Sequence, residues 1–454
     1  MYYKMQTFFV AGLSRSGISA ANFLRRRGAK VYLYDDDPEA YGREGVRALQ
    51  AGGAACVGKE GLAEACEESD VLVLSPGVPI DGELPLRFRR AGKRIVGEAE
   101  LGCLSLRAAP VAVTGTNGKT TTVAMLDEIF RAAGEKTFVC GNAGSPVTAI
   151  AEEAGFDDIA VMEVSSFQLE TLSSLRPHVA IVTNIAEDHL NRHYTMENYI
   201  FLKSKILQNM RESEFAVLNY DDPAVADMAA AARCPVRWFS LSEQVEGAYV
   251  QGGSIYYCGE RVTDVSDLSL HGAHNVKNAL AAVCAARLMG VEGEVIARAL
   301  ASVRGVHHRI ETVGEKNGVT FIDDSKGTNV EAALTALSCM EKDTVLLLGG
   351  KDKGDDYDKL FASLRGSRAV HCVLYGENRF RLLDAAVRAG EPRITLCTGF
   401  AVAVRVAAMT ARPGQCVLLS PACSSFDEFS GYEARGEKFA QIVESLPDDA
   451  VGCA

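Results

Sequence analysis

The 454-residue sequence lacks several features that would place it in a specialised class of protein. Its 13 cysteines include no Cys-x-x-Cys pair, so we expect free thiols in a reducing cytosol, with neither a disulfide framework nor a structural zinc site. No apolar run is long enough to span a bilayer, and the first residues lack the shape of a signal peptide. We therefore expect a cytoplasmic protein without membrane insertion.

Positive charge is also in deficit. The chain carries 47 Lys and Arg against 59 Asp and Glu, a formal net charge of −12. This balance disfavours nucleic acid and membrane surfaces as partners, so any anionic ligand has to be held by local positive groups. Hydrophobic content of 48% is that of an ordinary globular protein, and this length predicts about two to four domains.

A glycine-containing loop, Gly115-Thr-Asn-Gly118, follows a short apolar run and precedes a helical pattern. Backbone N–H groups and the helix dipole bind anions at such a junction. Lys119, the next residue, would reach the outer phosphates, and the hydroxyl of Thr120 could bind Mg²⁺. The strict P-loop pattern is not met, because Val113 stands where its first glycine belongs. An ordinary strand-to-helix turn is the alternative, and we favour phosphate binding.

The N-terminal segment predicts strands over 7–11, 30–34 and 71–74. A glycine turn after the first strand and acidic residues after the second resemble the opening of a Rossmann unit. Ser14 replaces the middle glycine of the dinucleotide pattern, which makes a smaller nucleotide more plausible than a dinucleotide. Ligands of open α/β sheets bind at the carboxyl ends of the strands. Plain turn chemistry is the alternative for any single residue here.

Strands expected over 159–164 and 179–184 alternate with helical stretches, which predicts a mainly parallel sheet with helices on both faces. Glu163 and His189 stand at or just past the strand ends, on the edge of the phosphate loop. We interpret Glu163 as a Mg²⁺ ligand in preference to a capping acid. For His189 alone, a hydrogen-bonding or core histidine is the usual interpretation, and Lys203 on a predicted helix would usually be solvated.

From Glu311 the pattern restarts with strands expected over 320–322, 344–348, 370–375 and 415–420. Lysines gathered at strand ends of an acidic protein suggest a site for carboxylates and phosphates. The sequence therefore predicts three α/β domains, with these proposed ranges: 1–106, 107–305 and 306–454. The strand-end residues of the third domain are Lys326, Lys351, Lys353 and Ser425.

Six segments of the chain occur in the order expected of Mur ligases, the ATP-dependent enzymes that build the peptidoglycan stem peptide. The resemblance covers essentially the whole chain and is closest to the members that add D-glutamate. An Asp-Asn-Pro-Arg motif, expected of diamino-acid-adding members, is absent. The segments are Thr114-Gly-Thr-Asn-Gly-Lys-Thr-Thr121, Glu163-Val-Ser-Ser-Phe-Gln-Leu169, Asn184 with Glu187-Asp-His189, Gly272-Ala-His-Asn-Val-Lys-Asn278, His308-Arg309 and Asp324-Ser-Lys-Gly-Thr-Asn329.

The resemblance implies a fold of three domains. A Rossmann-like N-terminal domain would bind the UDP of the substrate, a central P-loop-type domain would bind ATP, and a C-terminal Rossmann-like domain would bind the amino acid. It also implies an ATP-dependent ligase that adds D-glutamate to UDP-N-acetylmuramoyl-L-alanine through an acyl phosphate, in peptidoglycan biosynthesis. Two Mg²⁺ ions and a carbamylated Lys203 belong to this expectation, and we expect a monomer.

Individual roles follow from the same resemblance. The UDP-substrate contacts would be Ser14, Arg15, Asp36, Ser75, Gly77, Asn142 and Gln168. The ATP contacts would be Gly115, Thr116, Asn117, Gly118, Lys119, Thr120, Thr121, Asn275, Asn278, Arg309 and Asp324. Catalysis would depend on Lys119, Glu163, His189 and Lys203, with Mg²⁺ held by Thr120, Glu163, His189 and the Lys203 carbamate. D-Glutamate would meet Lys326, Thr328, Lys353, Ser425 and Tyr432.

Three departures from the family pattern concern local contacts. Tyr432 stands where phenylalanine is common, Gly327 where alanine is common, and Asn191 where an aspartate often occurs. The rival interpretations are another ligase of the same fold, including one that extends folate with glutamate, a nucleotide-dependent switch or transporter ATPase suggested by the phosphate loop alone, and an NAD-dependent oxidoreductase suggested by the N-terminal segment.

Overall fold

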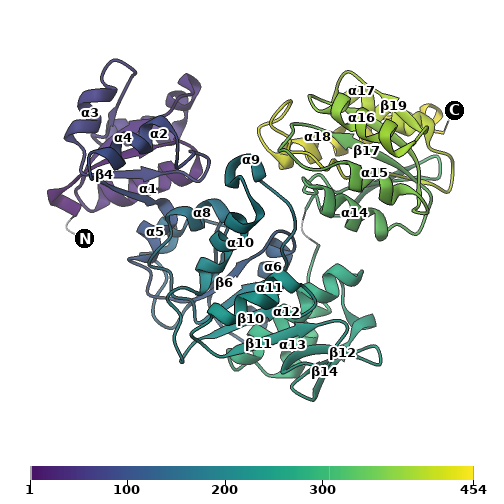
Figure 1. Cartoon of the computed structure of the whole chain (residues 1–454), viewed down its shortest axis with the longest axis horizontal. Coiled ribbons are helices and arrows are strands. Elements are labelled where there is room, and N and C mark those ends of the chain that lie inside the picture. Colours follow the sequence, from purple (N-terminus) through teal and green to yellow (C-terminus); the bar gives the residue numbers. More distant parts are fainter. Residues whose placement is uncertain (1–2, 306, 453–454) are drawn as a thin grey trace. The chain divides into compact units, whose positions relative to one another are not determined.

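The computed structural model describes residues 3–305 and 307–452. The chain forms two compact units. The first unit comprises Met1–Ile185 and Glu197–Val303, and the second comprises Ala186–Met196 and Arg304–Ala454. The first contains two sheets, coloured purple to teal in Figure 1, and the second contains one, coloured green to yellow. The domain boundary predicted at residue 306 lies outside the described residues, and the three proposed domain ranges stay a prediction.

The first sheet has the strand order β3-β2-β1-β4-β5, and all of its strand pairs are parallel. Its central strand β1 is an unbroken apolar run because both of its faces are covered. Helix α1 begins at Arg15, since Ser14 takes the extended N-cap conformation. The strands are Thr7–Ala11, Lys30–Tyr34, Ala55–Cys56, Val71–Leu74 and Arg94–Gly97 (β1–β5), and the helices are Arg15–Arg26, Glu44–Ala51, Leu62–Glu68, Glu83–Arg90 and Glu98–Cys103 (α1–α5).

The second sheet has nine strands in the order β14-β13-β12-β11-β10-β9-β6-β8-β7. Strands β12 to β14 form an antiparallel edge, and the other pairs are parallel. The strands are Ala109–Thr114, Thr137–Gly141, Ile159–Glu163, Val179–Val182, Phe215–Asn219, Val236–Ser240, Gly247–Gln251, Ser254–Tyr257 and Glu260–Asp264 (β6–β14). The helices are Lys119–Ala132, Val147–Ile150, Ser166–Thr171, Leu190–His193, Met196–Ser204, Pro223–Ala226, Ala273–Leu288 and Gly293–Leu300 (α6–α13), of which α9 lies in the second unit.

Helices α6 and α12 carry the apolar core on one face of the second sheet. Helix α12 packs against both α6 and the strands, so residues 279–286 are buried on every side. This explains its alanine-rich sequence, because small side chains let the helices and the sheet approach closely. The N-terminal ends of both helices are thereby held beside each other.

The third sheet has the order β15-β16-β20-β17-β18-β19, with β15 antiparallel to β16 and the other pairs parallel. Asn329 caps helix α14 by accepting a hydrogen bond from the amide of Ala332 (2.8 Å), which fixes the end of the loop after β16. The strands are Glu311–Lys316, Val319–Asp323, Thr344–Gly349, Ala369–Tyr375, Ile394–Leu396 and Cys416–Leu419 (β15–β20), and the helices are Val330–Ser338, Asp358–Leu364, Arg379–Ala389, Phe400–Thr410 and Tyr432–Ser445 (α14–α18).

Within the first unit, the two sheets are joined through helix α7. The buried Glu98 carboxylate accepts hydrogen bonds from both the amide and the hydroxyl of Thr148, each 2.7 Å long. That hydroxyl also bonds Ser19 of α1 (2.7 Å), and the guanidinium of Arg15 donates to the carbonyl of Gly144. These contacts fix the start of α1 relative to the loop that follows β7.

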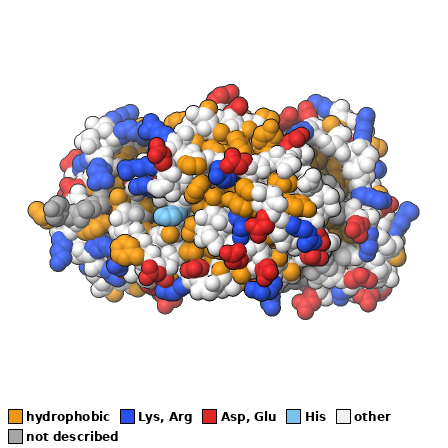
Figure 2. Space-filling model, turned by 90° about the horizontal axis from the view of Figure 1, so that it is seen from below, with side chains coloured by type: hydrophobic (Ala, Val, Ile, Leu, Met, Phe, Trp, Pro, Cys, Tyr) orange, Lys and Arg blue, Asp and Glu red, His pale blue; other side chains and the backbone are white. Residues whose placement is uncertain are grey.

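The surface agrees with the charge composition. On the face drawn in Figure 2, lysine and arginine side chains are interspersed with acidic and apolar ones. Among the described residues, no helix has the length and hydropathy needed to cross a membrane. The predicted fold class, an α/β protein with mainly parallel sheets, is confirmed.

Candidate functional site

The phosphate loop joins β6 to α6, and two of its glycines have backbone angles that favour glycine. Gly115 has φ of 139° and Gly118 has φ of 84°. A Cβ atom at Gly115 would lie 2.0 Å from the hydroxyl of Thr183, and one at Gly118 would lie 2.3 Å from the side-chain oxygen of Asn278. Both positions therefore exclude larger residues, and the loop is packed tightly against β9 and α12.

Bonds from Asn184, two residues past the end of β9, and from Lys119 fix the shape of the loop. The carbonyl of Asn184 accepts from the Thr116 amide (2.8 Å), and its side chain accepts from the Asn117 amide (2.9 Å). The Lys119 ammonium lies across the loop and donates to the carbonyls of Gly115 (3.0 Å) and Thr116 (2.8 Å). The sequence reasoning missed Asn184 as a site residue, although it stands in one of the six motifs.

Glu163, at the end of β8, forms hydrogen bonds with two of the predicted site residues. Its carboxylate accepts from the hydroxyl of Thr120 (2.6 Å) and from the amide of Asn142 (2.7 Å), and the residue is 2% exposed. Among the described residues there is no group of three or more His, Cys, Asp and Glu suited to a metal. A single carboxylate with a hydroxyl matches the sparse protein ligation of Mg²⁺, which usually takes its other ligands from phosphates and water.

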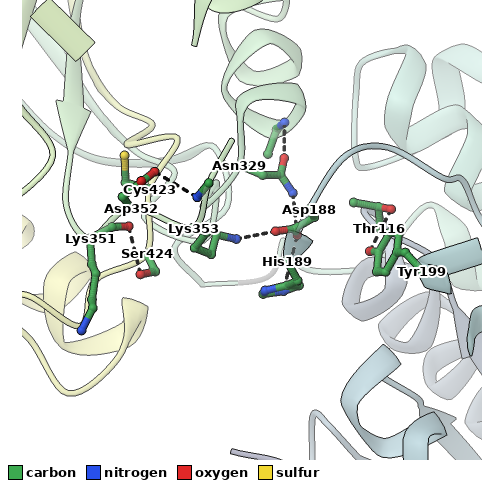
Figure 3. Close-up of polar contacts among 12 residues, drawn as sticks. Thr116, Asp188, His189, Tyr199, Asn329, Lys351, Asp352, Lys353, Cys423 and Ser424 are labelled. Atoms are coloured by element: carbon green, nitrogen blue, oxygen red, sulfur yellow. Dashed lines mark hydrogen bonds and ion pairs between the residues drawn. The ribbon is translucent and has the colours of Figure 1, made fainter. Parts of the chain in front are cut away.

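Lys203 of α10 is 1% exposed, so the solvated-face alternative is wrong for it. Its ammonium donates to the carbonyl of Gly115 (2.7 Å) and lies 4.6 Å from the centroid of the Tyr199 ring. Tyr199 in turn bonds the hydroxyl of Thr116 (3.1 Å), as drawn in Figure 3. Lys205 instead donates to the carbonyl of Leu169, so only Lys203 of these two lysines contacts the phosphate loop through the bonds described here.

The predicted ATP contacts of α12 lie beside the phosphate loop. Asn278 is buried, its amide donates to the side chain of Asn275 (3.4 Å), and its oxygen lies 3.5 Å from the hydroxyl of Thr122. The loop, Glu163, Lys203 and the start of α12 therefore form one polar cluster at the carboxyl ends of β6, β8 and β9, the edge at which α/β sheets bind ligands.

The predicted UDP contacts divide into two groups. Asp36 lines a cavity of about 260 Å³ at the carboxyl ends of β1 and β2, with Asp35, Val78 and Arg87 among its walls. Tyr34 donates a hydrogen bond to Asp36 (2.7 Å), and this bond raises the pKa of the tyrosine to about 12. The hydroxyl of Ser75 donates to the carbonyl of Gly12 (2.8 Å), while Ser14 and Gly77 are exposed.

Two further predicted UDP contacts lie close to the phosphate loop. Asn142 bonds Glu163, as described above, and Gln168 is half of a capping box with Ser165 at the start of α8. Arg15 contacts Gly144, two residues after Asn142. The bonds from Arg15 to Gly144 and from Ser19 to Thr148 thus connect the start of α1 to the segment beside Glu163.

In the second unit, the loops after β16 and β20 bring together Lys326, Ser425 and Tyr432. The ammonium of Lys326 donates to the Tyr432 hydroxyl (3.2 Å) and lies 4.9 Å from its ring centroid. Ser425 is buried, and the Thr328 amide donates to the Lys326 carbonyl (2.9 Å). The fully buried Arg435, which sequence reasoning missed, bonds Ser325 and the carbonyls of residues 423 and 424 and thereby holds these loops together.

Asp324 is another buried carboxyl of the second unit. The hydroxyl of Ser420 donates to it (2.6 Å). Burial raises the pKa of Asp324 to about 7, against the opposing effect of the Arg309 guanidinium. Both residues were predicted to contact ATP, and the structure places them near each other.

Asp188, which sequence reasoning also missed, forms the centre of a second polar cluster, shown in Figure 3. It pairs with Lys353 (2.5 Å) and accepts from the amide of Asn329 (3.1 Å). Burial acts to raise its pKa, but the Lys353 ammonium and His189 hold the pKa well below its ordinary value. His189 lies 3.5 Å from Asp188 and takes the left-handed conformation, with φ of 57°.

The location of His189 differs from the expectation. Strand β9 ends at Val182, two residues earlier than predicted, and His189 lies in the Ala186–Met196 segment of the second unit. The predicted site residues therefore fall into two sets. The first unit holds the UDP set, the phosphate loop, Glu163 and Lys203, and the second holds His189, Arg309, Asp324 and the D-glutamate set.

Comparison with known families gives three matches along the chain. An N-terminal domain described as "Mur ligase MurD-like" matches residues 6–97, the Mur ligase middle domain matches residues 113–286, and the domain described as "Mur ligase, glutamate ligase domain" matches residues 308–423. Together these ranges cover most of the sequence.

Curated relatives match over nearly the whole length. The UDP-N-acetylmuramoylalanine–D-glutamate ligase of Pelotomaculum thermopropionicum is 44% identical, over 96% of this chain and 97% of the relative. The enzyme of the same name from Caldanaerobacter subterraneus subsp. tengcongensis is 40% identical, over 98% and 100%.

Solved structures are similar in fold. The UDP-N-acetylmuramate-alanine ligase MurC of Thermotoga maritima aligns with a TM-score of 0.64 at 18% identity, covering 97% of this chain and 99% of that one. MurF of Acinetobacter baumannii aligns with a TM-score of 0.64 at 21% identity, covering 91% of each chain. At these identities the likeness shows the three-domain fold alone.

Proposed function

This chain belongs to the Mur ligase family, and on that basis we propose that it joins D-glutamate to the L-alanyl carboxylate of UDP-N-acetylmuramoyl-L-alanine at the expense of ATP. The observation that carries the proposal is full-length identity of 44% to a ligase of that name. The phosphate loop with Glu163 in the first unit, and the lysine-bearing loops of the second, would supply the side chains that this reaction needs.

The reaction requires activation because a free carboxylate resists attack by an amine. The γ-phosphoryl group of ATP is transferred to the alanyl carboxylate, and ADP leaves. The amine of D-glutamate then attacks the acyl phosphate and loses a proton, and inorganic phosphate leaves as the amide forms. Phosphoryl transfer depends mainly on positioning and on neutralisation of negative charge. The loop amides and Lys119 would bind the phosphates of ATP.

Mg²⁺ fits the oxygen donors of Thr120 and Glu163, which lie 2.6 Å apart. We propose these residues for one cation, and we propose His189 and a carbamylated Lys203 as further cation ligands. Bound cations would screen the repulsion between the carboxylate and the phosphate. Asn142 would orient Glu163 through its 2.7 Å hydrogen bond.

Lys203 is proposed to react with carbon dioxide and become a carbamate. The buried amine already contacts the phosphate loop at Gly115, and a carbamate there would be an anion able to ligate a cation, whereas an ammonium would repel one. Tyr199, stacked 4.6 Å from the lysine and bonded to Thr116, would keep the side chain directed at the loop.

The two carboxylates of D-glutamate would be bound by Lys326 and Lys353, with Ser425, Thr328 and Tyr432 as neutral donors. Two lysines for two carboxylates is the pattern that separates D-glutamate from monocarboxylic amino acids. On the UDP side, Asp36 lines the 260 Å³ cavity. Its carboxylate can accept a hydrogen bond from an N–H of uracil or an O–H of ribose, whereas it would repel the diphosphate. Residues 1–106, 107–305 and 306–454 would thus serve UDP, ATP and the amino acid.

A product-mass assay tests the proposal. Purified protein is given UDP-N-acetylmuramoyl-L-alanine, ATP and Mg²⁺ with D-glutamate, L-glutamate, L-alanine or a diamino acid in separate reactions. We expect the UDP substrate to gain the mass of one glutamyl residue only in the reaction that contains D-glutamate. ADP and phosphate should form there in equal amounts. Incorporation of another amino acid instead, or ATP hydrolysis without ligation, would reject the assignment. A Lys119→Ala variant is the control for contaminating activity.

A further inference from the structure

Asp188 has no role in the proposed mechanism, yet it forms an ion pair with Lys353, one of the residues proposed to bind D-glutamate. Its Oδ1 lies 2.5 Å from the ammonium of Lys353, and both side chains are only 8% exposed. Its other oxygen accepts from the amide of Asn329 (3.1 Å), so the carboxylate is fully engaged (Figure 3). The lysine that should receive a carboxylate from the substrate is therefore already paired with one.

A buried ammonium needs an anion, because removing it from water without a partner is strongly unfavourable. Asp355 is the other candidate. It is buried near Lys353, but its Oδ2 has no hydrogen-bond partner within the described part of the chain. Burial raises the pKa of Asp355 to about 7, whereas the Asp188 carboxylate lies 2.5 Å from the ammonium and forms the direct ion pair. Asp188 is thus the counter-ion of Lys353.

We propose that Asp188 is an internal stand-in for the substrate: it occupies Lys353 until a carboxylate of the incoming amino acid takes its place. This inference rests on the proposed function, in which Lys353 binds D-glutamate. One carboxylate replaces another, so the ammonium is never left unpaired. A ligand with a single carboxylate can bind Lys326 or displace Asp188 but cannot do both, and Asp188 therefore acts as a specificity-determining residue.

The exchange has a consequence for the segment that carries Asp188. Residues 186–196 are attached to the second unit through the Asp188 bonds to Lys353 and Asn329, and His189 is the next residue in the chain. Displacement removes the ion pair, which is one of the contacts that hold Asp188 in place. Binding of the amino acid would therefore loosen the backbone around His189, a proposed cation ligand.

Replacing Asp188 with Asn in the full chain removes the competitor and keeps an oxygen for Asn329. We expect the KM and the calorimetric Kd for D-glutamate to fall by at least about threefold, because a larger fraction of the protein then presents a vacant Lys353. The KM for ATP should not change. Glu187→Gln is the matched control, since it removes the same charge from the exposed preceding residue and should leave both constants unchanged.

A KM for D-glutamate that rises or stays constant in Asp188→Asn would overturn the inference, because Asp188 would then position Lys353 and not compete for it. The second readout is amide hydrogen exchange of residues 186–196 in the wild-type chain. Saturating D-glutamate should speed exchange in this segment, and Asp188→Asn should show fast exchange without ligand. No change on saturation of an active enzyme would reject the stand-in role alone.

Glutarate separates this inference from the proposed function, because it carries two carboxylates and no amine and cannot be ligated. If the chain fails to use D-glutamate but glutarate speeds exchange in residues 186–196, the proposed function is wrong and the stand-in role survives. If neither compound changes exchange, both are rejected.

Discussion

Two lysines are buried among the residues that the structure describes, and each is compensated in a different way. Lys203 bonds the carbonyl of Gly115 and lies over the ring of Tyr199, whereas Lys353 pairs with the Asp188 carboxylate. The two buried amines therefore lie in different surroundings, one beside the phosphate loop and the other beside a carboxylate.

Replacement of Lys203 by Ala should lower kcat by about 10²–10³-fold, the usual cost of removing one group that stabilises developing charge. Acetate or another short carboxylate should restore part of the activity by replacing the carbamate. Lys205→Ala is the matched control, since Lys205 donates to Leu169 and should show neither the large loss nor the response to acetate. Wild-type activity of the Lys203 variant without additive would exclude the carbamate.

The buried carboxyl of Asp355 should make the free energy of unfolding depend on pH. Its pKa is about 7 in the folded chain, against an ordinary value of 3.8. The native state therefore binds this proton more tightly than the unfolded state does. The free energy of unfolding is unaffected by the group below about pH 4 and falls as pH rises from about 4 to 7.

Asp355→Asn should remove that loss. We expect a stability gain on the order of 1–3 kcal/mol at pH 8 and almost none at pH 4, measured by urea unfolding. Asp356→Asn, on the exposed neighbour, changes the net charge equally and should give no pH-dependent gain. A gain of equal size at both pH values would show that the carboxyl of Asp355 is not the cause.

Among the elements, strands that are covered on both faces were the ones that the sequence predicted well. Strands β1, β4 and β17 are continuous apolar runs, and their bounds matched to within a residue. Strands β13 and β19 were missed, because they lie at or near sheet edges and have at most one buried residue each. Their pairing is decided by neighbours far along the chain, which a local pattern does not contain.

The same distinction applies to the site. Lys119, Thr120 and Glu163 could be proposed from the sequence because each stands in a local motif that follows or ends a strand, and their roles stay predictions. Their partners could not: the bond from Asn142 to Glu163 and the pair between Asp188 and Lys353 join positions 21 and 165 residues apart. Such pairs arise only when the strand order brings particular loops together.

The loop between β6 and α6 gives a prediction for an element. Gly118→Ala would place a Cβ atom 2.3 Å from the oxygen of Asn278 at φ of 84°. Gly134, just after α6, has a similar φ of 89° but an empty surrounding, so Gly134→Ala bears backbone strain alone.

We expect Gly134→Ala to cost about 1 kcal/mol and to keep nucleotide binding, since the left-handed conformation alone is mildly unfavourable for alanine. Gly118→Ala should cost more and abolish the rise in Tm that ATP produces in the wild type. Equal destabilisation of the two variants, with ATP binding kept in both, would contradict the packing of Asn278 on this loop.

On the scale of the whole molecule, the chain passes between its two compact units three times. Residues 186–196 leave the first unit and return to it, and the chain passes finally into the second unit after Val303. The segment between α13 and β15 contains the exposed Arg304 and no helix or strand among its described residues. A cut there would sever one of the three passages and leave the other two intact.

Limited trypsin digestion should therefore cut after Arg304 about tenfold faster than at sites within helices. The two fragments should elute together in size-exclusion chromatography without denaturant, because residues 186–196 stay attached to the smaller fragment through Asp188 and Lys353. Arg304→Gln removes the site and serves as the control. Separation of the fragments would mean that this attachment is too weak to hold them.

The bonds through α7 set one spacing within the first unit. Arg15 is fixed to Gly144, and Asn142, two residues before it, is fixed to Glu163. If the diphosphate of the sugar nucleotide lies at Arg15 and the activated carboxylate at Glu163, the protein selects substrates by the distance between these two groups. A sugar-nucleotide substrate with one sugar more or fewer between its diphosphate and its carboxylate would then be rejected because of its length, even if both of its ends were recognised.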